Sequence, residues 1–570
     1  MRLQFHKASA MGRRLASKAR GGCFALAGAA VLAGAAVLAG QPAGASETLS
    51  FSYGPLIRSL KISSLQKFAE DGTVEDDLAF FLALVKPEDY PLLRKALTEK
   101  ADVDPLIVSR FFNSDLGEDT LERLGKAITM LRGGNGMSIL RAALVNASFS
   151  NDGLSLLSVL EQLPANVQIH GEKVLAAEQA TKRVIAATER LDSVMRQLTA
   201  EEAKGDAPAD FSAMADLRKP GPLAVSKEVW NLRDSRRNRS FYVDVYTPRN
   251  PPAGKLPVIV FSHGLASRPE DFSEAMQQLA SHGYVVAAPQ HPGSDAIWLK
   301  EMLRGLHKDI FDINDFSNRP KDISFVIDEL ERRNATQFSG KLDLTRVALA
   351  GHSFGGYTVL ALGGATVDLA YLRKECERPF GGLNVSLLLQ CQALRLPPEQ
   401  LTNLQDSRTA AVFAANPVNR SIFGKKGIST VKVPVVMASG SYDPATPPAL
   451  EQAASFTWLN GADKYWLIVQ GQAHVDFTKI DPGIKDAIES MTEITLPSQG
   501  VISNYMKGVA LPFFEVHLRQ NNSYKPYLRS SYAEYLSKDE RFKLFMVSGR
   551  STPKLVDAID TFRRQYPEPK

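Results

Sequence analysis

The run Arg346-Val347-Ala348-Leu349-Ala350-Gly351-His352-Ser353-Phe354-Gly355-Gly356-Tyr357 decides the fold class of this chain. A small apolar, β-prone segment leads into a Gly-x-Ser-x-Gly turn, and a helix-compatible segment follows as far as Leu362. This order predicts a strand, a sharp turn with Ser353 at its apex, and a helix. Such a turn strains the serine backbone and leaves no room for side chains two positions away, which gives Gly351 and Gly355 a steric reason to be there. Ser353 is therefore our candidate nucleophile.

Strand and helix patterns alternate from residue 222 onward, after a predicted hairpin around residues 234–238. Near-continuous Val, Ile and Ala runs separated by helical segments predict a parallel sheet with helices on both faces. We therefore assign residues 222–570 to an α/β domain with a mostly parallel sheet. The expected strands cover residues 257–262, 284–288, 346–350, 410–415, 433–439 and 465–470.

Residues 1–45 are typical of a secretory signal peptide. A basic start precedes an uncharged stretch rich in Ala, Val and Leu, and Ala43-Gly44-Ala45 is a cleavage site of the A-x-A type. The segment predicts export to the periplasm or the extracellular space, with cleavage near Ala45. The pair Arg13-Arg14 suggests export by the twin-arginine route, but the residues that follow the pair support that route poorly. An uncleaved membrane anchor is the alternative.

The formal net charge of +5 depends on the same segment. Residues 1–45 contain no acidic residue, and their basic residues account for the positive balance of the chain. The rest of the sequence therefore gives no sign of a basic, nucleic-acid-binding surface. The basic residues of the segment are Arg2, Lys7, Arg13, Arg14, Lys18 and Arg20.

Residues 46–199 show short apolar patterns of helical period. Asp104-Pro105, for example, reads as an N-cap followed by a proline at the first helical position. The helical period predicts an all-helical domain. The sequence of this region has no metal-ligand cluster and no phosphate-binding loop, so we assign no role to the domain. Residues 200–221 contain Lys, Asp, Ala and Pro but few large apolar residues, and we interpret them as the linker to the α/β domain.

An excess connection over residues 364–407 follows the helix that begins at the serine turn. Its length of about 45 residues is too great for a plain crossover, and Leu387-Leu388-Leu389 makes it apolar. We interpret it as a lid over the active site, with a structural excursion away from the site as the alternative. The insertion contains Cys376 and Cys391, the two cysteines outside residues 1–45. An even pair in an exported protein favours a disulfide that staples the lid, and two free buried thiols are the alternative.

A serine nucleophile needs two backbone N–H groups to hold the negative charge that develops on the attacked carbonyl oxygen. In this architecture one belongs to the residue after the nucleophile, here Phe354, and the other to the loop after an early strand. The segment Ser262-His263-Gly264-Leu265 fits that loop, with Leu265 as the donor and Gly264 allowing a close approach of the backbone. His263 lies too early in the chain to be the catalytic base, so we predict a structural role for it.

The acid and the base of a catalytic triad are expected on loops after two later strands. Asp443 follows one predicted strand and His474 follows the next, so the order Ser353, Asp443, His474 matches this architecture. His474 would take the proton of Ser353, and Asp443 would fix the imidazole tautomer. Asp476 is the nearest rival acid, but its position two residues past His474 favours the surface. The remaining central and late histidines have no metal-like spacing with carboxylates or cysteines, so we predict no metal and no cofactor: His291, His307, His352 and His517.

Four segments of the chain together resemble α/β-hydrolases of the platelet-activating-factor acetylhydrolase and dienelactone hydrolase group. The resemblance covers about residues 222–530 and implies the α/β-hydrolase fold and ester hydrolysis by a serine. The whole layout, with its N-terminal domain, is similar to a cyanobacterial type of these hydrolases in which that domain has no assigned function. The four segments are residues 258–265, 351–356, 439–444 and 471–477.

One position departs from the pattern of the acetylhydrolases. In those enzymes the acid follows the strand before the one that precedes Asp443, and here that position reads Ala414-Ala415-Asn416-Pro417, without a carboxylate. The departure supports Asp443 as the acid and weakens the transfer of a substrate preference.

The sequence thus predicts an exported serine hydrolase that cleaves carboxylic esters through an acyl-enzyme. The apolar lid favours short- or medium-chain acyl esters or lipid-like esters as substrates, and contact with a membrane surface. We expect a small-molecule ester as the partner and no nucleic acid. Acyl transfer to another acceptor on the same triad, and a catalytically silent binding or scaffold protein, are the alternatives.

Overall fold

The computed structural model describes residues 46–567, apart from residues 84, 132, 379–382 and 475–497. The predicted signal peptide at residues 1–45 lies outside the described residues, and so does the rival acid Asp476. In the part of the chain that is described, no helix combines the length and the apolar character needed to span a membrane.

A nine-stranded sheet forms the centre of the molecule, in the order β13-β12-β11-β10-β9-β7-β8-β6-β5. The strands from β8 to β12 run parallel to their neighbours, and β5, β6 and β13 are antiparallel at the two edges. The predicted α/β-hydrolase class is therefore confirmed. The strands are β5 (Val225–Asp234), β6 (Arg239–Pro248), β7 (Leu256–Ser262), β8 (Val285–Pro289), β9 (Leu342–His352), β10 (Thr409–Ala415), β11 (Val435–Gly440), β12 (Lys464–Val469) and β13 (Leu544–Ser548).

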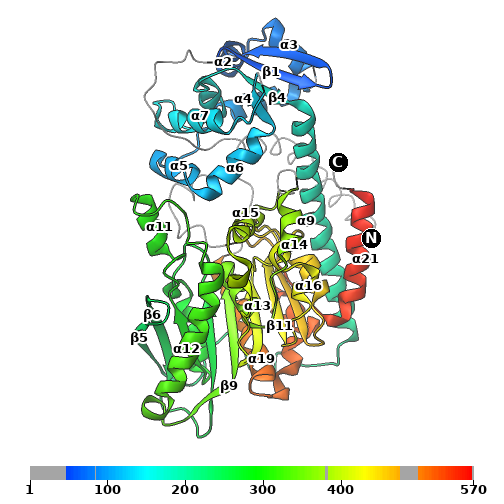
Figure 1. The fold of residues 1–570 in the computed structure, drawn as a ribbon. Coiled ribbons are helices and arrows are strands. Elements are labelled where there is room, and N and C mark those ends of the chain that lie inside the picture. Colours follow the sequence, from blue (N-terminus) through cyan, green and yellow to red (C-terminus); the bar gives the residue numbers. More distant parts are fainter. Residues whose placement is uncertain (1–45, 84, 132, 379–382, 475–497, 568–570) are drawn as a thin grey trace, which may run out of the picture.

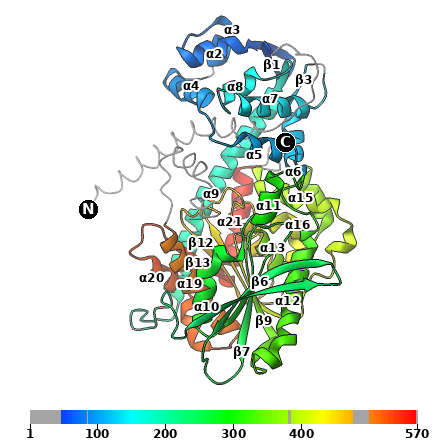
Figure 2. The ribbon, with the colours of Figure 1, turned by 90° about the vertical axis from the view of Figure 1, so that its left-hand side faces the viewer.

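Helices cover both faces of this sheet, because its central strands are apolar on both sides. Val258 and Val260 of β7 belong to the core under α12, α13 and α21, whereas Ile259 belongs to the core under α10, α19 and α20. Figure 2 shows α10 and α19 on one side of the strands and α12 on the other. The helices are α10 (Ser273–Ser281), α11 (Ala296–Leu303), α12 (Asp315–Gln337), α13 (Phe354–Leu362), α16 (Arg420–Ile428), α17 (Gln452–Trp458), α19 (Gln499–His517), α20 (Ser530–Ser537) and α21 (Thr552–Gln565).

The N-terminal part is not all-helical, so that prediction is not confirmed. It contains a four-stranded sheet in the order β2-β1-β4-β3, with helices packed around it. Residues 48–61 form a hairpin of two antiparallel strands. Its turn contains Gly54, whose φ of 55° suits glycine. The strands are β1 (Thr48–Tyr53), β2 (Leu56–Lys61), β3 (Ile128–Met130) and β4 (Val167–His170), and the helices are α2 (Ile62–Glu70), α3 (Asp76–Leu82), α4 (Tyr90–Thr98), α5 (Pro105–Phe112), α6 (Asp115–Gly125), α7 (Met137–Phe149) and α8 (Leu156–Glu161).

A single long helix, α9 (Gly171–Gly205), joins the two parts (Figure 1). Its first half leaves the N-terminal sheet, and its second half contributes Leu191, Val194, Met195 and Leu198 to the hydrolase core. Glu202, near its end, is buried and accepts hydrogen bonds from the amide of Ser548 and the hydroxyl of Ser551. The predicted linker, residues 200–221, therefore begins inside this helix.

The insertion at residues 364–407 lies between the hydrolase core and the N-terminal part. It forms α14 (Leu369–Cys376) and α15 (Val385–Gln392), and a disulfide joins Cys376 to Cys391. Helix α15 contacts α6, and Arg395 just beyond it forms an ion pair with Asp115 at the start of α6 (Figure 1). That the insertion acts as a lid over the active site stays a prediction.

Candidate active site

Ser353 lies at the sharp turn between β9 and α13, as the sequence predicts. Its φ of 56° and ψ of −115° are strained for a residue with a side chain. A Cβ at Gly351 would lie 2.3 Å from the carbonyl oxygen of Gly355, and a Cβ at Gly355 would lie 2.0 Å from that of Ser262. The two glycines are therefore required for the backbone to pass so close to itself, and the turn presents Ser353 at the carboxyl end of β9.

Asp443 and His474 lie beside Ser353 in a continuous hydrogen-bonded chain. The hydroxyl of Ser353 is 2.8 Å from Nε2 of His474, and Nδ1 of His474 is 2.7 Å from Oδ2 of Asp443. Because a carboxylate can only accept, Nδ1–H donates to Asp443 and Nε2 is left as the acceptor for the serine proton. This arrangement prepares His474 to act as a base toward Ser353.

The carboxylate of Asp443 is buried and receives hydrogen bonds from several groups besides His474. Oδ1 accepts from the amides of Ala445 and Thr446, and Oδ2 accepts from the Thr446 hydroxyl and from Nδ2 of Asn416, at 2.6 Å. Burial alone would raise the pKa of Asp443, but the interaction with His474 and the hydrogen bonds from Thr446 outweigh it and lower the pKa to about 2. Asp443 is therefore ionised at neutral pH.

Asn416 was missed as a site residue by the sequence reasoning, although its position was noticed. It occupies the place where the resemblance led us to look for an acid and found none. In the structure its side chain supports the acid that follows the next strand, Asp443. Its φ of 46° lies in the left-handed region, which asparagine tolerates better than most residues.

His352, directly before the candidate nucleophile Ser353, holds the backbone of the candidate base His474. Nε2 of His352 donates to the carbonyl oxygen of His474 at 2.9 Å. Burial lowers the pKa of His352 to about 3, so the ring is neutral at ordinary pH and adds no positive charge beside His474. Sequence reasoning weighed His352 only as a metal ligand and had no signal for this role.

The two predicted oxyanion donors lie on either side of Ser353. Phe354 begins α13, so its amide is among the helix N–H groups that have no partner within the helix. A Cβ at Gly264 would lie 3.3 Å from the Cβ of Ser353, which places the Gly264–Leu265 peptide against the nucleophile. Across the described ranges, neither the Leu265 amide nor the Phe354 amide donates to another protein group. Both N–H groups are therefore free to bind a substrate oxygen.

Two further observations concern metal ligands and cavities. Among the described residues, no group of three or more His, Cys, Asp or Glu side chains has the arrangement of a metal site. A cavity of about 210 Å³ lies between α9, α21 and the insertion, and its lining includes none of the triad residues. That cavity is therefore separate from the candidate active site.

The mostly parallel sheet, the strained serine turn and the Ser-His-Asp hydrogen bonds define an α/β-hydrolase. The comparisons with known proteins agree with this class. A family model described as "Alpha/beta hydrolase of unknown function (DUF1400)" matches residues 45–170, and a model described as "Chlorophyllase" matches residues 231–389. The chain is thus an α/β-hydrolase by fold, and two of its regions match models of that class.

Two curated relatives match part of this chain. A platelet-activating factor acetylhydrolase of Bos taurus is 28% identical over 139 residues, which make up 19% of this chain and 31% of the relative. The acetylhydrolase of Cavia porcellus is 29% identical over 136 residues, again 19% of this chain and 31% of the relative. The matched part of the chain thus spans less than a third of the length of these relatives.

Proposed function

We propose that the chain is a serine hydrolase that cleaves carboxylic esters through an acyl-enzyme. The observation that carries the proposal is the continuous chain of hydrogen bonds from Asp443 through His474 to Ser353, which lies at a strained turn at the carboxyl end of β9. The names of the similar proteins, an acetylhydrolase and a chlorophyllase, support chemistry of this type.

The geometry supports the following sequence of steps. Ser353 Oγ attacks the ester carbonyl carbon while its proton passes to Nε2 of His474, and the Leu265 and Phe354 amides hold the resulting oxyanion. The C–O bond to the alcohol then breaks, and His474 returns the proton to the alcohol oxygen. Water attacks the acyl-enzyme by the same route, with its proton passing first to His474 and then to Ser353, which releases the carboxylic acid. Asp443 stays ionised throughout and stabilises the imidazolium.

The proposed substrates are esters with short- or medium-chain acyl groups or lipid-like esters. Leu387 and Leu389 of the insertion are buried in the hydrolase core. They therefore help to hold the insertion against that core and do not form an apolar outer surface. Contact with a membrane would instead have to use exposed residues such as Val385. Export with cleavage after Ala45 is part of the same proposal, and an N-terminal sequence of the mature protein that begins at Ser46 would support it.

Labelling with a fluorophosphonate probe is the test of the nucleophile. We expect labelling of the mature wild-type chain and none of Ser353→Ala. The matched control is Ser212→Ala, which removes an exposed hydroxyl far along the chain from the site and should label like wild type. Labelling that persists in Ser353→Ala would refute the mechanism.

Turnover of 4-nitrophenyl esters of increasing chain length then defines the acyl preference. Hydrolysis predicts free carboxylic acid as the product even when a primary alcohol is added. A new ester of the added alcohol as the main product would favour the alternative of acyl transfer. A folded wild-type protein that neither labels nor turns over any ester would favour the silent scaffold protein.

A further inference from the structure

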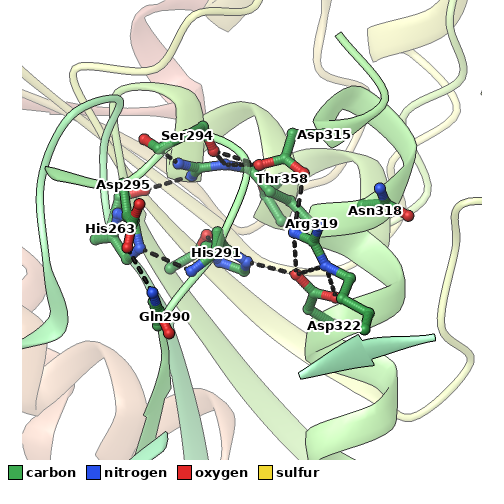
Figure 3. Close-up of polar contacts among 12 residues, drawn as sticks. His263, Gln290, His291, Ser294, Asp295, Asp315, Asn318, Arg319, Asp322 and Thr358 are labelled. Carbon is green, nitrogen blue, oxygen red and sulfur yellow. Dashed lines mark hydrogen bonds and ion pairs between the residues drawn. The ribbon is translucent and has the colours of Figure 1, made fainter. Parts of the chain in front are cut away.

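A cluster of buried charges lies next to the active site but takes no part in the steps above. We call it the buried charge cluster, and its members are joined by hydrogen bonds and ion pairs (Figure 3). Four of the five are buried, with Arg319 in α12 among the largest fully buried side chains of the described structure, and the fifth, Arg239, keeps 11% of its side chain exposed. The cluster consists of Arg239, His291, Asp315, Arg319 and Asp322.

The Nε atom of Arg319 lies 3.9 Å from the Asp315 carboxylate, and the two terminal nitrogens of the guanidinium reach the loop that carries the Leu265 amide. The guanidinium donates to the carbonyl oxygen of His263 at 2.5 Å and to that of Gly264 at 3.1 Å, and its Nε donates to the hydroxyl of Ser294 at 2.8 Å. The carbonyl of Gly264 also accepts from Nδ1 of His263, at 2.8 Å. Two donors therefore fix the direction of this one carbonyl group.

The direction of the Gly264 carbonyl decides where the Leu265 N–H points. In a trans peptide the C=O of one residue and the N–H of the next are coplanar and point in opposite directions. No cis peptide occurs among the described residues. With its carbonyl held by Arg319, the Gly264–Leu265 peptide must present the Leu265 N–H on the face opposite to the arginine. Gly264 itself lies against Ser353, so one peptide connects the buried arginine to the nucleophile.

The same arginine also contacts the other oxyanion donor. The Cζ atom of Arg319 lies 4.5 Å from the centre of the Phe354 ring, which is fully buried. Phe316 packs against that ring from the side, with 4.9 Å between the ring centres. The side chain that follows the nucleophile is thus confined between Arg319 and an aromatic neighbour, and its backbone amide is confined with it.

Asp315 and the Ser294 hydroxyl keep Arg319 charged and in place. The Ser294 hydroxyl that accepts from Arg319 donates in turn to Asp315, and Arg239 pairs with both Asp315 and Asp322. Burial lowers the pKa of Arg319 to about 10, which still leaves it protonated at neutral pH. Arg239 is the useful comparison, because it is bound to the same carboxylates but makes no contact with the Leu265 loop or with Phe354.

We propose that Arg319 is the positioning residue of the oxyanion hole, which fixes the Leu265 amide and Phe354 in the geometry that the transition state needs. The inference rests on the proposed function, because an oxyanion hole has no use without a serine ester mechanism. Preset donors act only on the charge that develops during the reaction, so a positioning role affects kcat and leaves substrate binding nearly unchanged.

The test compares Arg319→Lys with Arg239→Lys in the full mature chain. Lysine keeps the charge but cannot bridge two carbonyls and a hydroxyl from a planar fork. We expect kcat for a 4-nitrophenyl ester to fall about 100-fold in Arg319→Lys, with KM changed by less than about twofold. The inhibition constant of an alkylboronic acid, which forms a tetrahedral adduct with the serine, should rise by the same factor as kcat/KM falls. Arg239→Lys should keep kcat to within about fivefold.

Two outcomes would overturn the inference. One is a wild-type kcat and boronate affinity in Arg319→Lys, and the other is an equal loss of kcat in Arg239→Lys, which would mean that only the stability of the cluster matters. If Arg319→Lys does not fold, Ser294→Ala carries the test, because it removes the hydroxyl that accepts from Arg319 and donates to Asp315 but leaves the arginine itself in place. It should lower kcat about fivefold without a change in KM, as expected for one loosened hydrogen bond, and an unchanged kcat would again overturn the inference.

The proposed function is judged separately in the same experiment. Turnover by wild type that disappears in Ser353→Ala establishes the serine mechanism, whatever Arg319→Lys does. An absence of turnover and of labelling in wild type would refute the proposed function and this inference with it.

Discussion

Replacing Glu451 with glutamine should lower the melting temperature of the hydrolase domain by several degrees. Glu451 lies just before α17 and is fully buried, and both of its carboxylate oxygens are occupied by hydrogen-bond donors. It joins the insertion to the segment that follows Asn416, which supports the acid of the triad. Its five donors are Nδ2 of Asn384, Oγ of Ser386 and Nε2 of Gln390 on one oxygen, and the amides of Asn419 and Arg420 on the other.

The size of the effect follows from these contacts. Glutamine keeps the shape of the side chain but turns one acceptor oxygen into an NH₂ group, so either two or three of the five hydrogen bonds are lost. At about 2 kcal/mol for each hydrogen bond to a charged group, the loss is about 4 to 6 kcal/mol in the free energy of unfolding. With an unfolding entropy near 2.1 cal/mol/K per residue and about 350 residues in the domain, the melting temperature falls by about 5 to 8 °C.

Thermal unfolding followed by far-UV circular dichroism measures this shift. The control is Glu399→Gln, which makes the same chemical change at an exposed position of the same insertion and should leave the melting temperature unchanged. A Glu451→Gln protein that melts within about 1 °C of wild type would refute the reasoning, because it would mean that the buried carboxylate contributes little through its donors.

Two further predictions concern the acid of the triad and the contact between the two parts of the chain. The pKa of Asp443 is lowered to about 2 on folding, so this group adds stability above its unfolded pKa of about 3.9 and loses it as the pH falls toward 2. Asp443→Asn should therefore cost about 2 kcal/mol at about pH 6, and the difference from wild type in urea unfolding should shrink at about pH 3; a difference independent of pH would contradict the assignment. Asp115→Asn removes the carboxylate that pairs with Lys308 and Arg395, across the contact between the N-terminal part and the hydrolase domain. Because both lost ion pairs are partly exposed, we expect amide hydrogen exchange in α6 and α15 to be faster by up to about tenfold. Asp102→Asn, at an exposed position, should leave the exchange as in wild type, and equal rates in all three proteins would exclude a role for these ion pairs.

The parts of the fold that the sequence predicted well are those encoded by local pattern. The glycines around Ser353 are dictated by steric contact within one turn, and the parallel strands are dictated by apolar runs that must be buried on both faces. The order of Ser353, Asp443 and His474 along the chain was enough to choose the three residues that the structure brings together. The N-terminal sheet was missed because residues 46–199 were interpreted as helices throughout, whereas residues 48–61 form a hairpin that is only partly buried.

The supporting residues of the site could not be predicted in the same way. Arg319 lies in a helix among other polar residues, and its partners are backbone carbonyls of residues 263 and 264, which carry no side-chain signature in the sequence. Asn416 showed only that an acid was absent, not that an amide would support an acid elsewhere. Such contacts depend on which segments the fold brings together. One sequence does not show which segments, far apart in the chain, lie close in space.

The long helix α9 has a consequence for the order in which this protein is synthesised. Its second half is made early, yet the groups that bury it come from the far end of the chain: β13, and the Ser548 and Ser551 groups that bind Glu202. While the ribosome is still adding the intervening residues, this half-helix lacks the contacts that α20, β13 and α21 supply. The hydrolase domain therefore closes only after synthesis has passed Ser551, whereas the N-terminal sheet has all of its strands by His170. The two parts of the chain can thus complete their folds at very different times during synthesis. The second half of α9 waits for its C-terminal contacts through most of translation.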